Sequence, residues 1–204
     1  MTADLVLPAP DDRLTAAKLA VLGMISGAVS WVLVDFSDQL DLSFDIESTG
    51  LLFLPISIYP GLVFGLVFAT LLHLWAKVLW LRAIGFVFAA GLAYLAAFHV
   101  AFHIIADGFS SADTSLPYIV GGIRGGLAGS LVLGLLTKFL LQVPARLVLR
   151  RPVVVGAIAG ALLGLASFED HNGWGFFAFF VLWQGIYAAS LASLMRRSAG
   201  ASAS

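Results

Sequence analysis

The sequence contains no cysteine and few charged residues. The absence of cysteine excludes disulfides, thiolate metal sites and cysteine nucleophiles. Only 11% of the 204 residues are charged, against about 25% in soluble domains, and 60% are hydrophobic. A chain of this composition cannot cover a surface that faces water, so the lipid bilayer is its expected solvent and first partner.

Motifs for nucleotide binding and hydrolysis are also missing. The chain has no Walker sequence, no G-x-S-x-G and no Rossmann fingerprint, and it has no basic soluble face for nucleic acid. We therefore expect no nucleic-acid partner and no cofactor, and the sequence favours a non-enzymatic function.

Six apolar segments dominate what is present. A membrane-spanning helix needs about 20 mostly apolar residues to cross about 30 Å of hydrocarbon, and its backbone groups must be paired within the segment. Segments that meet or approach this length are 15–35, 51–74, 83–106, 116–141, 152–168 and 174–194. The sequence predicts an all-α fold, a single bundle of six transmembrane helices over residues 1–197, with a disordered tail at 198–204.

The basic residues alternate with the acidic ones along the chain. Every lysine and arginine except Arg124 flanks the same ends of the six segments, and acidic residues occupy the opposite connections. Basic residues gather on the cytoplasmic side of membrane proteins. This pattern predicts that both termini are cytoplasmic and that the chain is a multi-pass protein of the bacterial inner membrane.

Arg124 lies inside the fourth segment, about 12 Å from its outer end. The pairs Gly121-Gly122 and Gly125-Gly126 flank it, and they permit a kink, an unwound turn or very close backbone packing. An arginine at this depth costs at least about 2.5–3.5 kcal/mol and generally faces a bundle interior or water. We expect Arg124 to bind a ligand in the interior. A structural ion pair with Asp107 or Asp35, or an outward-reaching side chain, is the alternative.

His99, His103 and Asp107 are four residues apart in the third segment, so they share one helix face. They are predicted to contact the ligand or carry protons, and helix–helix hydrogen bonds are an alternative. The two histidines are also weak metal candidates, with Asp107 or His171 as a third ligand. The pair lacks the glutamate of H-E-x-x-H, and no metal is expected.

These polar residues gather in the outer half of the bundle, which suggests a cavity open to the outside. The predicted ligand-binding residues are Arg124, His99, His103, Asp107, Gly122 and Gly125, with a possible second shell of Asp35, Glu169, Asp170 and His171. The glycines would supply backbone donors to an anion.

Three functions are compatible with this pattern. The leading hypothesis is a small transporter or substrate-binding membrane subunit for an anionic or proton-coupled ligand. The second is a non-catalytic structural subunit of a larger membrane complex, in which small residues pack against a membrane protein partner or a second copy of the chain. The third is a membrane-embedded metal- or haem-binding enzyme that uses His99 and His103.

Overall fold

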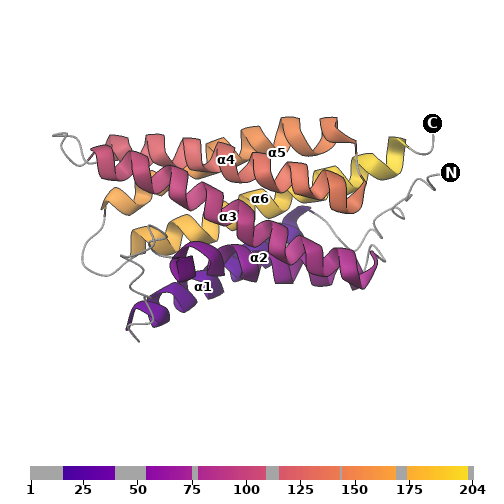
Figure 1. Cartoon of the computed structure of the whole chain (residues 1–204), viewed down its shortest axis with the longest axis horizontal. Helices are drawn as coiled ribbons and strands as arrows, with labels where there is room; N and C mark the ends of the chain where they lie inside the picture. The colour runs from indigo at the N-terminus through magenta and orange to yellow at the C-terminus, as the bar shows by residue number, and fades with distance from the viewer. Residues whose placement is uncertain are drawn as a thin grey trace.

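The computed structural model describes residues 16–39, 54–74, 78–108, 115–142, 144–168 and 174–201. These residues form six α-helices and one 3₁₀ helix (Figure 1). The elements are α1 (Ala16–Gln39), α2 (Leu54–Leu74), α3 (Trp80–Gly108), α4 (Ser115–Leu141), α5 (Ala145–Gly160), η1 (Ala161–Phe168) and α6 (Trp174–Ala201). The all-α fold and its six helices are confirmed. The helix α6 includes part of the segment 198–204, and residues 202–204 lie outside the described residues.

The helices form a closed ring in chain order. Each helix packs against the next one in the sequence, and α6 returns to pack against α1. Successive helices run in opposite directions (Figure 1). We call the end where α3 stops and α4 begins the acidic end, and the end where α4 stops and α5 begins the basic end. The acidic end lies at the left of Figure 1 and the basic end at the right.

The fifth segment differs in detail from its prediction. Its α-helix begins at Ala145, before Arg150 and Arg151, and it changes to a 3₁₀ helix after Gly160. Runs of 3₁₀ helix longer than three or four residues are uncommon because their hydrogen bonds are poorer, and no sequence signal marks this one.

Glycines set how closely neighbouring helices approach. On α1, Gly23 and Gly27 lie against the backbone of α6 at Gln184 and Phe180. On α4, Gly126 lies against the backbone of Gly156 on α5. A Cβ atom at any of these glycines would overlap its neighbour. Small residues at four-residue spacing therefore pack the bundle internally, as they do in many membrane proteins.

A buried amide joins three helices inside the ring. The Nε2 of Gln184 donates to the Oγ of Ser30 at 3.0 Å and to the carbonyl oxygen of Pro60 at 3.4 Å, which links α6 to α1 and α2. Gln184 is fully buried. Helix–helix hydrogen bonds of this kind are typical of a lone amide in an apolar segment.

The outer surface is apolar. Leu81 is 80% exposed and Phe139 is 71% exposed, and large aliphatic side chains of α1 such as Ile25 and Val32 are also exposed. In water, a patch of this extent would drive association. Among the described residues, five helices are long and apolar enough to cross a membrane, and a shorter apolar helix covers Ile58–Leu74. The chain is a multi-pass membrane protein, and its exposed apolar side chains face lipid.

Candidate functional site: an aromatic cavity at the acidic end

A cavity of about 400 Å³ lies inside the ring, towards the acidic end. Ligand pockets commonly enclose about 300–1,000 Å³. Residues from α1, α3, α4, α5, η1 and α6 line it. They are Trp31, Val34, Asp35, Tyr94, Ala97, Phe98, Ala101, Phe102, Gly122, Gly125, Gly126, Gly160, Leu163, Phe176, Phe179, Phe180 and Trp183.

The walls of the cavity differ in the size of their side chains. The wall from α4 and α5 consists of Gly122, Gly125, Gly126 and Gly160, which have no side chains to fill the space. The other walls carry large aromatic rings from α1, α3 and α6. Because one wall is bare backbone and the rest are bulky, the helices pack closely at the glycines and leave a hollow beside them.

Ring–ring contacts hold the aromatic walls in place. Trp31 of α1 packs edge-on against Phe177 of α6, with ring centroids 5.4 Å apart, and its ring stacks with Trp174. Deeper in the bundle, Tyr94 of α3 contacts Trp183 of α6 edge-on at 5.6 Å. Such pairs contribute about 0.5–1.5 kcal/mol beyond the area that they bury. The cavity therefore has fixed aromatic walls.

The wall also contains a carboxylate. Asp35 is exposed and lies in the last turns of α1, at the acidic end of the cavity. It is the charged residue that lines the cavity among the residues that the structure describes. Sequence reasoning placed Asp35 in a second shell, and the structure brings it to the cavity itself.

A second, much smaller cavity lies beyond the floor of the first. It measures about 20 Å³ and shares Tyr94 and Trp183 with the large cavity. Ser130 and Tyr187 also line it. A volume of about 10–15 Å³ is enough for one water molecule when polar partners surround it. The rings of Tyr94 and Trp183 therefore border both cavities, and the smaller one, lined mainly by apolar residues, has the size of one water.

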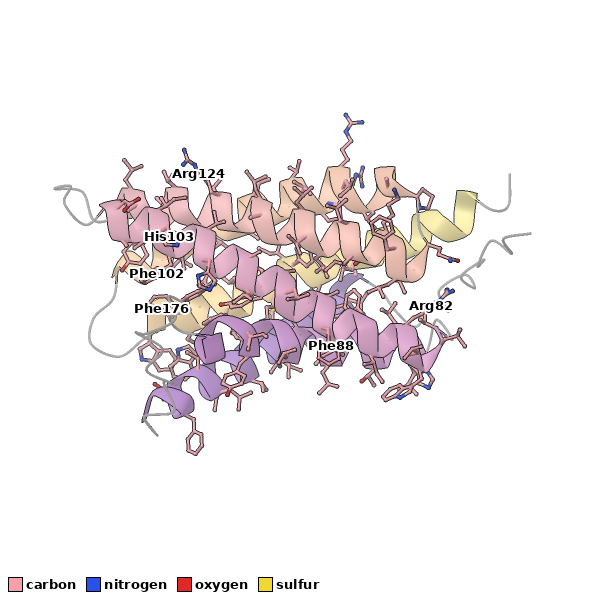
Figure 2. All side chains as sticks on the ribbon, in the orientation of Figure 1. Arg82, Phe88, Phe102, His103, Arg124 and Phe176 are labelled. Carbon is pink, nitrogen blue, oxygen red and sulfur yellow. The ribbon has the colours of Figure 1, made fainter. Side chains whose placement is uncertain are left out.

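The expectation that Arg124 faces the bundle interior is wrong. Its side chain is exposed and points away from the bundle (Figure 2). Gly125 packs against Ala97 of α3, and Gly122 and Gly126 pack against α5. Arg124 is two residues from both Gly122 and Gly126, which places it about 160–200° around the helix axis, opposite α5. The glycines serve close backbone packing, and α4 is an unbroken helix from Ser115 to Leu141.

His99, His103 and Asp107 share one face of α3, but the cavity lies on another. Ala97 and Ala101 of α3 contact α4. His99 is two residues from each of them, about 160–200° around the helix axis, so it faces away from α4 and Arg124. His99 is half-buried, and His103 and Asp107 are exposed. The expected meeting of Arg124 and the histidines is wrong, and none of His99, His103 and Asp107 lines the cavity.

Two of the six predicted ligand-binding residues, Gly122 and Gly125, line the cavity. Glu169, Asp170 and His171 lie outside the described residues. Among the residues that are described, no group of three histidine, aspartate or glutamate side chains is placed to hold a metal ion.

Sequence reasoning missed the aromatic walls. It did not select Phe98, Phe102 or Phe176, which line the cavity. Phe102 and Phe176 lie towards the acidic end of the bundle (Figure 2). Aromatic residues are common in apolar helices, so their number carries no signal. Only the closing of the helices into a ring, with α6 packed on α1 and its rings in contact with Tyr94 of α3, brings these residues to one cavity.

The fold and the cavity define a class: a small multi-pass helical membrane protein with an aromatic cavity inside its ring of helices. Comparisons with protein-family models, with curated proteins and with solved structures give no match for this chain.

Proposed function

We propose that the protein binds an amphipathic small molecule in the aromatic cavity, as a small transporter or as the substrate-binding subunit of one. The observation that carries this proposal is the cavity of about 400 Å³, lined by aromatic rings and closed on one side by bare glycine backbone. Mostly apolar pockets with a few polar groups are typical of small-molecule sites.

The orientation of the site follows from the flanking charges. The positive-inside rule places the basic end, with both termini, in the cytoplasm of a bacterial inner membrane. The cavity then belongs to the outer half of the bundle, so the ligand enters from the outer side. This is the half in which sequence reasoning placed a binding site.

The chemistry of the wall favours a different ligand from the anion first expected. Arg124 and His103, the proposed anion contacts, are exposed on faces outside the cavity. An anion in the cavity would lie beside the carboxylate of Asp35 and against the negative faces of aromatic rings. We therefore assign the site to a molecule with a large apolar part.

The proposal is tested with probes that share a phenylbutyl body and differ in their head group: trimethylammonium, methyl sulfone and sulfonate. Binding is measured by equilibrium dialysis against the protein in phosphatidylcholine nanodiscs, with empty nanodiscs as the baseline for partition into lipid. At least one probe is expected to bind the protein in a saturable manner.

A pair of matched variants locates the binding. Val34→Trp adds an indole at the cavity wall and should weaken binding at least about tenfold, because it fills space that the ligand needs. Val32→Trp adds the same ring two residues away, at a side chain that is 55% exposed on the outer surface, and should leave binding unchanged. If no probe binds, or if both variants behave alike, the proposed function is wrong.

A further inference from the structure

We infer that the ligand of the cavity is an organic cation with an apolar body. This inference rests on the proposed function and goes beyond it, because it assigns the sign of the ligand's charge and the groups that recognise it. The recognising groups are the faces of the aromatic rings and the carboxylate of Asp35.

The aromatic rings favour a cation by their electrostatic character. The face of an aromatic ring carries negative charge density, and a cation within about 6 Å of its centroid is attracted to it. Trp31, Phe98 and Phe102 line the cavity from α1 and α3, and Phe176, Phe179 and Trp183 line it from α6. Rings from three helices thus line one hollow, and groups of aromatic rings are the usual sites for quaternary ammonium ligands.

The charge at the cavity wall also favours a cation. The described residues that line the cavity include Asp35 and no lysine, arginine or histidine. The positive charge nearest along α4, that of Arg124, is directed away from the bundle (Figure 2). The carboxylate of Asp35 attracts a cation and repels an anion at the acidic end of the cavity, with the moderate strength of a solvent-exposed charge.

Alkylated ammonium ions are weakly hydrated, which suits them to apolar walls. Burial of a charge is costly unless the charge is paired. A quaternary or bulky tertiary ammonium spreads its charge over alkyl groups that also gain from apolar burial, at about 25 cal/mol per Å² of surface removed from water. A compact ammonium would lose more hydration and bury less surface. The apolar walls therefore favour the alkylated cation.

The size of the cavity limits the body of the ligand. Its volume of about 400 Å³ corresponds to roughly 13 water molecules at about 30 Å³ each. A ligand of about a dozen non-hydrogen atoms fits it, with the charged group near Asp35 and the apolar body towards Tyr94. A phenylbutyl chain with a trimethylammonium head group has this size.

The head-group series described above also tests this inference. We expect the trimethylammonium probe to bind at least about tenfold more tightly than the neutral methyl sulfone, and the sulfonate to bind most weakly. Asp35→Asn should remove most of the preference for the cation, because it replaces a charge with an amide of the same shape.

A matched variant controls for the general field of the acidic end. Asp107→Asn removes a carboxylate that is exposed near the end of α3 and does not line the cavity, and it should leave the preference intact. Trp31→Leu should weaken binding of the cation more than binding of the sulfone, since it removes a ring face but keeps an apolar side chain.

The outcomes separate this inference from the proposed function. Equal affinity for the cation and the sulfone, with sensitivity to Val34→Trp, would keep the cavity as a binding site and overturn the cation assignment. Tightest binding of the sulfonate would also overturn it, as would a preference for the cation that survives both Asp35→Asn and Trp31→Leu. Absence of binding by all three probes would overturn the proposed function and the inference together.

Discussion

Arg124 shows how one side chain can be deep along a helix and still lie at the surface. It is nine residues after Ser115, about 13 Å along α4, and its side chain is exposed. Helical Cα–Cβ bonds tilt towards the helix N-terminus, which for α4 is the acidic end. The guanidinium therefore extends towards the head groups at the acidic end, and this snorkelling offsets part of the cost of the charge in lipid.

The position of Arg124 gives a prediction about binding. Arg124→Ala should change the affinity for a probe that binds the cavity by no more than about twofold, because surface substitutions usually alter free energies by less than about 0.5 kcal/mol. The measurement is the same dialysis experiment, with Val34→Trp as the positive control. A loss of tenfold or more in a variant that folds normally would restore the sequence-based assignment of Arg124 to the ligand site.

The glycines around Arg124 indicate its orientation, although its depth along the segment favoured a side chain that faces the interior. Gly121 and Gly125 occupy one face of α4, and Gly122 and Gly126 occupy the adjacent face. Two glycine faces require two close neighbours, and α3 and α5 fill them. Arg124 therefore lies on the remaining side of α4. The cost of a buried charge fixes how rare such a residue is, but helix packing fixes where the residue points.

At the scale of helices, the lengths of the apolar segments predicted the elements closely. The segment expected at 116–141 is the helix Ser115–Leu141, and the segment expected at 174–194 lies within Trp174–Ala201. Apolar length determines where a chain enters and leaves a membrane, so it is legible in one sequence. The rotation of each helix about its own axis depends on which helices pack against it, and a single sequence does not give those neighbours. This is why the elements were predicted and the cavity walls were not.

The glycine contacts yield a prediction about stability. A Cβ at Gly126 would overlap the carbonyl oxygen of Gly156 and lie 3.3 Å from the Cα of Gly160, and neither backbone atom can turn aside. Gly126→Ala should therefore lower the stability of the folded protein by about 1–3 kcal/mol. Thermal unfolding in detergent, followed by circular dichroism, measures the change.

Gly85→Ala is the matched control. A Cβ at Gly85 would meet a methyl carbon at the end of the Leu140 side chain at 2.8 Å, and this side chain can rotate. The substitution also gains up to about 1 kcal/mol of helix propensity. Its unfolding temperature should equal or exceed that of the unmodified protein. Equal losses for the two variants would mean that the backbone contact between α4 and α5 is not what limits stability.

At the scale of the whole molecule, the closed ring of helices explains why the cavity exists. Each helix contacts its two neighbours in the ring, and aromatic side chains fill the centre of the basic half, where Phe64 stacks on Phe68 and meets Tyr187 edge-on. Towards the acidic end the glycine wall leaves the centre unfilled. The ring is therefore packed towards its basic end and hollow towards its acidic end, which suits a protein that takes up a ligand from one side.

The most direct test of this account is the position of a bound ligand. A crystal of the protein grown with a phenylbutyl-trimethylammonium probe that carries bromine on its ring would give an anomalous difference peak for that atom. The account predicts a peak inside the ring, between Tyr94 of α3 and Leu163 of η1. A peak found only on the outer faces, beside His103 or Arg124, would contradict it.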